Sequence, residues 1–208
     1  MSIEASAVRL KPFDFDTNIA GVGENHPLYP LIETDGVVFP FTPTVVEQVQ
    51  INYDKQEFTH SNEGYMTYNN TSNRQIAISN IVFPCDTEEN GKYALAVIHF
   101  FRTYSFMDFG ADSTGKPPSP MWFYGFGSML YNKVPVLMAG TDFTLSDQEM
   151  DHMAITGIDG STQWLPAKLS LGGITLTVQH TPSYWRGGDS NVSLEAYRNG
   201  SLITGGNR

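Results

Sequence analysis

The chain has 208 residues, with 22 acidic and 12 basic side chains, and its formal net charge is −10. This length fits one domain with long loops and a sizeable core. The charge argues against ordinary nucleic-acid binding, which needs a basic surface, and it is uneven: residues 1–90 hold 13 acids and 4 bases, whereas residues 91–208 hold 9 and 8.

Hydrophobicity and cysteine content indicate a protein made and folded in a cytosol. The sequence contains no run of 18 apolar residues, the length that a membrane-spanning helix needs. The N-terminus lacks the apolar stretch of a secretory signal. A single cysteine, Cys85, excludes an intramolecular disulfide and is expected to be buried. Glycosylation needs a secretory route, so we interpret four Asn-x-Ser/Thr triplets as chance matches, at Asn69, Asn70, Asn191 and Asn199.

The first part of the chain predicts an extended segment followed by two strands. Residues 1–42 are polar, contain prolines and show no clear period, so we expect an extended N-terminal arm ahead of a domain at 43–208. A strand is predicted at Val45–Tyr53, with one face made of Val45, Val49, Ile51 and Tyr53. Residues 54–74, rich in Asn, Ser, Thr and Gly, predict a long loop or an irregular hairpin. Gln75–Phe83 predicts another strand.

The only long helix is predicted at Asp86–Met107. Asp86 and Glu89 have the spacing of a capping box, and acids at this end suit the helix dipole. Gly91 costs about 1 kcal/mol inside a helix, so a regular helix beginning only at Lys92 is an alternative. The apolar stripe consists of Tyr93, Val97, Phe100, Phe101 and Tyr104.

Residues 115–145 predict a hairpin with two apolar faces. Its strands are expected at Met121–Tyr131 and Val134–Met138, joined by a turn at Asn132 and Lys133. A strand with one wet face alternates apolar and polar residues, and these strands do not. We therefore expect both faces to be covered, by the rest of the chain or by another chain.

The remaining elements complete an α+β fold that is mainly antiparallel β. Residues 146–158 predict a loop with a turn of helix. Between Ala167 and Val178 the apolar residues change from odd to even positions at Gly172 and Gly173. Either a two-residue hairpin or a β-bulge would produce this change. Strands, one helix and more strands predict a β-sandwich or barrel with one flanking helix.

The sequence shows no catalytic motif, and we expect neither an enzyme, nor a metal site, nor a cofactor. Asp151, His152 and Glu149 lack a second histidine at metal-ligand spacing, and His99 is interpreted as a core histidine. A glycosidase-like carboxylate pair could come from Glu57, Glu63, Asp86, Glu88 and Glu89, although any acidic chain offers such pairs. A sugar-stacking loop could come from Tyr65, Tyr68 and Asn69.

Several short motifs occur in an order that resembles the tail-tube initiator and tube-cap proteins of contractile-tailed bacteriophage baseplates. The resemblance covers roughly residues 43–205. The motifs are the strand at 45–53 with its Tyr/Asn-rich loop, QIAIS at 75–79, YALAVIHFFRT at 93–103, FG at 109–110, GKPP at 115–118, the aromatic strand with Gly125, YNKVPV at 131–136 and YRNGSL at 197–202. The length is less than that of the larger members, and residues 1–42 match no part of the family.

The resemblance implies two packed antiparallel sheets with a flanking helix, and six copies that form a ring around a DNA channel. Such a ring starts or caps the tail tube in the virion baseplate and is assembled in the host cytoplasm. Its partners would be further copies of the chain, the tail tube protein, and the baseplate hub and wedge proteins. DNA would pass through without specific binding, since an acidic wall repels it; no membrane is involved.

The resemblance also gives candidate residues for the ring. Candidates for the subunit interface are Trp122, Phe123, Tyr124 and Phe126 in the hairpin and Phe100, Phe101 and Tyr104 in the helix, each with ordinary core packing as the alternative. Candidates for the lumen or the inter-ring loop are Glu47, Glu57, Glu63, Tyr65 and Tyr68. The loop at 54–74 is expected to become ordered only on stacking.

Three alternatives remain at the level of the sequence. The first is a tail tube protein proper rather than its initiator or cap. The second is a carbohydrate-binding β-sandwich that uses the tyrosine loop. The third is an enzyme that degrades the cell wall, which would need a titratable pair in a cleft.

Overall fold

The structure is a computed structural model of the whole chain. It describes residues 7–15, 23, 26, 28–60, 62–107, 115–127, 130–144, 151–156, 160–178, 195 and 198–200. Asn199 and Gly200 form a turn at the end of this part, where Gly200 has a φ of +74°.

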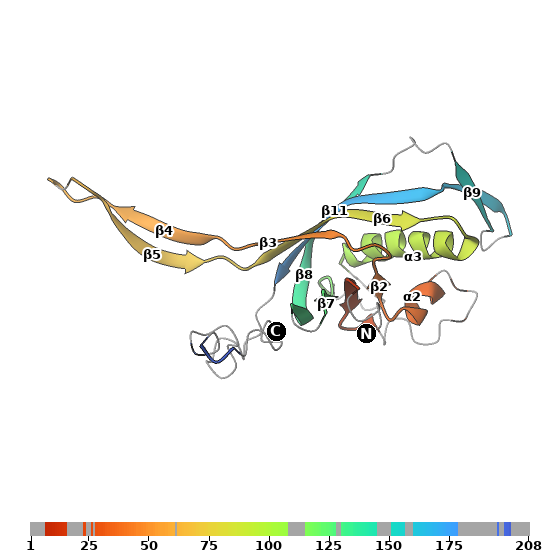
Figure 1. The fold of residues 1–208 in the computed structure, drawn as a ribbon, viewed down its shortest axis with the longest axis horizontal. Coiled ribbons are helices and arrows are strands. Elements are labelled where there is room, and N and C mark those ends of the chain that lie inside the picture. The colour runs from red at the N-terminus through yellow and green to blue at the C-terminus, as the bar shows by residue number, and fades with distance from the viewer. Residues whose placement is uncertain are drawn as a thin grey trace.

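One antiparallel sheet dominates the described part of the chain (Figure 1), so the α+β, mainly antiparallel fold is confirmed. Its strand order is β2-β1-β7-β8-β11-β6-β3. The bounds are β1 (Arg9–Pro12), β2 (Val37–Val38), β3 (Thr44–Gln48), β6 (Gln75–Pro84), β7 (Met121–Gly125), β8 (Tyr131–Thr144) and β11 (Lys168–Val178). Two separate two-stranded ribbons are added: β4 (Ile51–Gln56) with β5 (Tyr65–Thr71), and β9 (His152–Thr156) with β10 (Thr162–Pro166).

The sheet is covered by a helix and not by a second large sheet. Helix α3 (Glu88–Tyr104) lies along one face of the strands β6 and β11, and the short helix α2 (Tyr29–Glu33) packs beside it (Figure 1). The expected sandwich or barrel is therefore wrong in this respect: the described strands form no closed barrel, and the apolar layer opposite the sheet comes from α3. The helix can supply that layer because Ala94, Val97 and Phe101 are fully buried.

The parity flip at Gly172 and Gly173 is a bulge within one long strand. β11 continues through both glycines, and its register against β8 shifts between Leu171 and Gly173. Against β6 the register stays continuous, because β6 flips at the same point. There Asn80 has a φ of 57°, and the buried side chains change from Ile76 and Ile78 to Ile81 and Phe83. Both strands thus keep their apolar side chains toward the helix.

Helix α3 begins one residue later than the predicted capping box. Thr87 is the N-cap, and its Oγ1 accepts a hydrogen bond from the backbone N–H of Asn90 (3.2 Å). Asp86 contributes differently, by accepting from the side-chain amide of Asn90 (2.6 Å). Gly91 lies inside the helix, so the alternative start at Lys92 is wrong.

A second ribbon explains the glycine in the helix and corrects one prediction. Residues 152–156 form strand β9 and not the predicted loop with a turn of helix. β9 packs on the first turns of α3, where a Cβ at Gly91 would lie 2.2 Å from Cδ1 of Ile155. Glycine allows this contact without a shift of the Ile155 side chain, so close packing offsets the helix propensity lost at Gly91.

The N-terminal segment is part of the domain, where we predicted a separate arm. β1 pairs with β7 and β2 pairs with β1. Val8, Leu10 and Val37 are buried in the common core at 1%, 0% and 0% exposure. The sequence hid this because strands of only 4 and 2 residues are too short to show an alternating pattern.

The aromatic hairpin turns earlier than predicted. The chain leaves β7 at Gly125, with Phe126 at φ 56° and Gly127 at φ 80°, and enters β8 at Tyr131. The expected turn residues Asn132 and Lys133 instead lie inside β8, where the register shifts and Lys133 has a φ of 58°. The positive φ values at residues 126 and 127 mark the actual reversal.

Candidate assembly surface

The ribbon of β4 and β5, residues 51–71, projects from the body as a continuation of two sheet strands (Figure 1). β3 runs into β4 through residues 49–50, and β5 runs into β6 through residues 72–74. The backbone N–H of Ser72 donates to the carbonyl of Gln50 (2.8 Å) and carries the pairing across this junction. The predicted irregular hairpin is confirmed; its order in solution stays a prediction.

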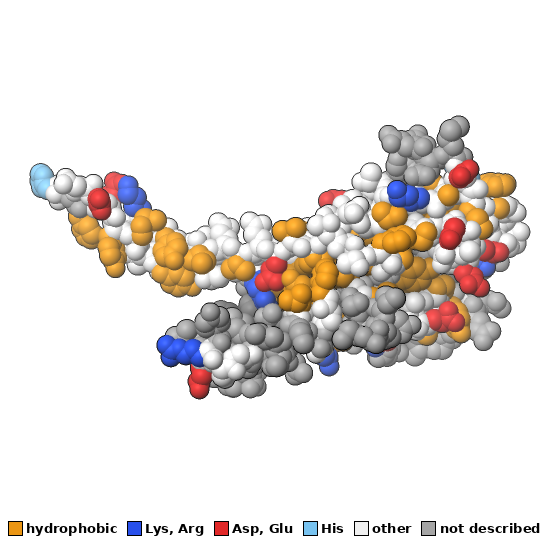
Figure 2. Space-filling view, viewed as in Figure 1, with side chains coloured by type: hydrophobic (Ala, Val, Ile, Leu, Met, Phe, Trp, Pro, Cys, Tyr) orange, Lys and Arg blue, Asp and Glu red, His pale blue; other side chains and the backbone are white. Residues whose placement is uncertain are grey.

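One face of the ribbon is apolar and exposed. Cross-strand pairing brings Tyr53 opposite Tyr68 and Lys55 opposite Met66, while Ile51 stands opposite Thr71. The rings of Tyr53 and Tyr68 meet edge to face, with centroids 6.0 Å apart. Ile51, Tyr53, Met66 and Tyr68, which we call the apolar ribbon face, are 52–57% exposed. Figure 2 shows apolar side chains along one edge of the projecting ribbon.

The other face of the ribbon is mainly polar. Asn52 donates from its side-chain amide to Asn70 (2.7 Å) and to Ser72 (3.3 Å). Asp54 stands opposite Thr67, and Gln56 stands opposite Tyr65. The ribbon is therefore amphipathic, with one face suited to water and one suited to a partner.

The predicted sugar-stacking loop is divided between these two faces. Tyr68 lies with Tyr53 on the apolar ribbon face, whereas Tyr65 lies on the polar face with Gln56. Asn69 is the extra residue where the register shifts between Asn52 and Tyr53. Because Tyr65 and Tyr68 point to opposite sides, they cannot stack together on one sugar ring.

A polar contact fixes the base of the ribbon to the body. Glu47 on β3 accepts hydrogen bonds from Arg74 (3.1 Å) and from the hydroxyl of Tyr131 on β8 (2.8 Å). β3 and β8 are separated by β11 and β6 in the sheet, so the sheet must curl to bring these residues together. Burial, and next the Glu47 carboxylate, raise the pKa of Tyr131 to about 12.

The acids predicted to line a channel contribute less net negative charge than the sequence suggests, because cations lie beside some of them. Glu47 forms an ion pair with Arg74, and Glu57 pairs with Lys55 in the ribbon. Glu63 precedes β5 beside Gly64, at a shallow depression also lined by Phe58. A channel position for these acids stays a prediction; Glu47 and Glu57 each lie beside a cation.

The interface candidates separate into core and surface residues. Phe100, Phe101 and Phe123 are buried within the chain at 3%, 0% and 0% exposure, so the alternative of ordinary core packing applies to them. Trp122, Tyr124 and Tyr104 are half-buried, and Phe126 is 37% exposed. The outer face of the hairpin is partly covered by the chain itself, because Phe13 stacks on Trp122 with ring centroids 3.9 Å apart.

The residues considered for catalysis do not converge. Glu88 pairs with Lys92, whose hydrogen bond lowers the pKa of that carboxyl, whereas a general acid needs a raised one. Asp86, Glu88 and Glu89 lie at the start of α3, at the opposite end of the molecule from the ribbon (Figure 1). His99 is exposed, which corrects its interpretation as a core histidine.

The described part of the chain offers no cluster of metal ligands and no helix that could span a membrane. No group of three or more His, Cys, Asp or Glu side chains there could hold a metal ion; Glu149 lies outside it. Cys85 is buried as expected. Among the described helices, none is both long and apolar enough to cross a membrane.

Comparison with known proteins gives no relative. No protein-family model matches the sequence, and no curated protein matches it significantly.

The apolar ribbon face is a candidate functional surface that sequence reasoning only half found. The alternation of Val49, Ile51 and Tyr53 was visible on the first strand. The second strand was hidden, because Met66 and Tyr68 stand in an Asn-rich stretch and the bulge at Asn69 breaks the alternation.

Proposed function

We propose that this chain is a structural protein that assembles with copies of itself, and that it forms the ring that starts or caps the tail tube in a phage baseplate. The exposed apolar face of the β4–β5 ribbon carries the assembly part of the proposal. The order of motifs that resembles tube-initiator proteins supports the baseplate part. The channel of such a ring surrounds DNA, and its partners are the tail tube, hub and wedge proteins.

An isolated two-stranded ribbon needs a partner. Two strands alone are at best marginally stable in water. Tyr53 and Tyr68 expose more than half of their surface, although aromatic side chains gain most from burial. A neighbouring chain that covers this face would stabilise the ribbon and bury apolar area in one step.

The rest of the described structure suits an assembly role. The sheet has two ends, at β2 and β3, and an end strand presents backbone groups that another chain can pair with. A contact between two different surfaces of one chain repeats from copy to copy and closes into a ring when the rotation allows. A permanent interface of this kind often exceeds about 2,000 Å².

The first test is the assembly state of the purified chain, measured by mass photometry over a concentration series. The chain is measured alone and then with the tail tube protein from the same genome. We expect closed hexamers, or a monomer that seeds tube growth. A monomer at every concentration that seeds nothing would exclude the proposal and favour a binding module.

A matched pair of variants connects the test to the ribbon. Tyr53→Ser with Tyr68→Ser removes the aromatic part of the apolar ribbon face. Tyr65→Ser removes one tyrosine from the polar face, next to the same strands. We expect the first change to abolish assembly and the second to leave it. Equal loss from both would contradict a role for the apolar face.

A further inference from the structure

A group of cations lies on the outer face of the sheet, away from the helix. On β1 the side chain of Leu10 is fully buried, so Arg9 and Lys11 point to the other side. In the register, Arg9 stands opposite Tyr124 and Lys11 stands opposite Trp122. The Arg9 guanidinium lies 4.6 Å from the centroid of the Tyr124 ring. We call this surface, with Lys133, the cation–aromatic face.

Lys133 joins this face through the irregular start of β8. Its Nζ lies 4.9 Å from the centroid of the Trp122 ring. Phe13 stacks on the same indole, at 3.9 Å between centroids and 14° between planes. A stacked ring fills one side of Trp122, so an ammonium at this distance must lie over the other side.

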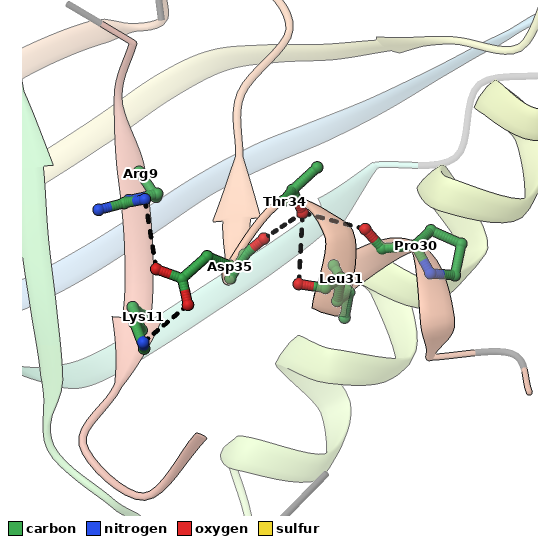
Figure 3. Close-up of polar contacts among 7 residues, drawn as sticks. Arg9, Lys11, Pro30, Leu31, Thr34 and Asp35 are labelled. Carbon is green, nitrogen blue, oxygen red and sulfur yellow. Dashed lines mark hydrogen bonds and ion pairs between the residues drawn. The ribbon is translucent and has the colours of Figure 1, made fainter. Parts of the chain in front are cut away.

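Asp35 anchors two of the cations. It accepts a hydrogen bond from Lys11 (2.7 Å) and lies 3.5 Å from Arg9 (Figure 3). Asp35 has a φ of 53°, and a Cβ at the next residue, Gly36, would lie 2.6 Å from the carbonyl oxygen of Leu10. The turn is therefore pressed against β1, and it holds Asp35 beside the cations.

The face offers positive charge, and its Trp122 ring is already occupied. Counting Arg9, Lys11 and Lys133 against Asp35 gives +3 − 1 = +2, in a chain whose total is −10. The ring of Trp122 is already in contact with Phe13 and Lys133, so a sugar or a base has no free side of it to stack on. A surface of this kind suits an acidic partner.

The ribbon has the complementary character. Residues 51–71 contain Asp54, Glu57 and Glu63 against Lys55, which gives −3 + 1 = −2, and the ribbon projects away from its own body (Figure 1). We infer that the acidic ribbon of one copy docks on the cation–aromatic face of a second copy. This rests on the proposed function, since both need a second copy, and it names the contact between copies.

The test exchanges charges between the two surfaces. The quantity measured, by mass photometry, is the concentration at which half of the chains are assembled. Lys133→Glu reverses the receiving face, and Glu57→Lys reverses the ribbon. Each should raise the half-assembly concentration by about tenfold or more, because like charges would meet. The double variant should return to within about threefold of the wild type. Lys92→Glu, on the exposed side of α3, is the control and should change little.

Salt and nucleic acid give independent readouts. Raising the salt from about 0.15 M to about 1 M shortens the Debye length from about 8 Å to about 3 Å. This should weaken assembly of the wild type and of the double variant, in which opposite charges meet, more than that of either single variant. Circular dichroism checks that each variant is folded. A labelled single-stranded oligonucleotide should bind neither wild type nor variant.

The outcomes separate this inference from the proposed function. If the wild type assembles but the reversals have no effect, or the double variant is as weak as the worse single one, the docking surface is wrong and the assembly proposal stands. If the wild type never assembles or seeds a tube, both fall. Oligonucleotide binding that Lys133→Glu abolishes would assign the face to nucleic acid and overturn the docking.

Discussion

The body and the ribbon use the same alternation of apolar side chains with opposite results. In β11, Leu176 and Ile174 are 0% and 2% exposed because α3 and the neighbouring strands lie on them. In the ribbon, Tyr53 and Met66 are 52% and 56% exposed because nothing in the described chain covers them. The alternation along a strand therefore sets which side is apolar, and a covering layer decides whether that side is buried in the core or exposed on the surface.

The largest expected difference between the two regions is in stability. Phe101→Ala removes a fully buried ring from α3 and should lower the free energy of unfolding by about 3–5 kcal/mol. Tyr53→Ala, on the ribbon, should change it by only about 0.5 kcal/mol or less. Urea denaturation of the monomer measures both, and a comparable loss at Tyr53 would show that the ribbon belongs to the body's cooperative unit.

A smaller effect is expected where the second ribbon meets the helix. Gly91→Ala adds a Cβ that would lie 2.2 Å from Cδ1 of Ile155, and the resulting overpacking should cost about 1–3 kcal/mol, although alanine is the better helix former. The measurement is thermal and urea unfolding of the variant.

Ile155→Val provides the control for Gly91. This change removes Cδ1 and alone should cost about 0.5–1.5 kcal/mol. Combined with Gly91→Ala it should restore part of the lost stability, because the space is now free. A double variant whose losses simply add would mean that the glycine is needed for another reason.

The sequence predicts local structure well where one pattern acts over many residues. The helix was found because its apolar stripe extends over several turns, and β6 was found from a run of apolar residues. The bulge at Gly172 and Gly173 was one of two alternatives. Choosing it needed the pairing to β6, a contact about 90 residues away that periodicity does not contain.

The predictions that failed share a physical cause. Each concerns a feature that depends on a contact between residues far apart in the sequence. β1 and β2 are too short for a pattern, and only pairing with β7 makes them strands. Gly91 looked like a flaw in a helix because Ile155 was not known to lie beside it. For the candidate surface, the sequence placed Tyr53 on a strand face and named Tyr68 as a loop candidate, but it did not show that the two rings meet across the ribbon.

Removing the N-cap of helix α3 should have a smaller effect on the free energy of unfolding. Thr87→Ala removes the side-chain oxygen that accepts from the backbone N–H of Asn90 and should cost about 1 kcal/mol. Asp86→Ala removes only the contact with the Asn90 side chain and should cost less, since that pair is exposed. Urea unfolding compares the two, and the reverse order would return the N-cap role to Asp86.

The smallest effect at neutral pH is expected at the junction between body and ribbon. The pKa of Tyr131 is raised to about 12 in the folded protein, against about 10 for a free tyrosine. A raised pKa means that the folded state holds the proton more tightly. The stability from this group is therefore fully present below pH of about 10 and is lost as the pH rises toward 12.

Absorbance titration of the phenolate tests this directly. The wild type should show a component near pH 12 that Tyr131→Phe removes. Burial also raises the pKa of Tyr93, so the late ionisation of that tyrosine should remain in the variant. Glu47→Gln keeps the hydrogen-bond acceptor but removes the charge, so it should lower the pKa of Tyr131 only in part, because burial is the larger cause. If Tyr131→Phe removed no late component, Tyr131 would not have the raised pKa, and the contact with Glu47 could not be what ties the ribbon to the body.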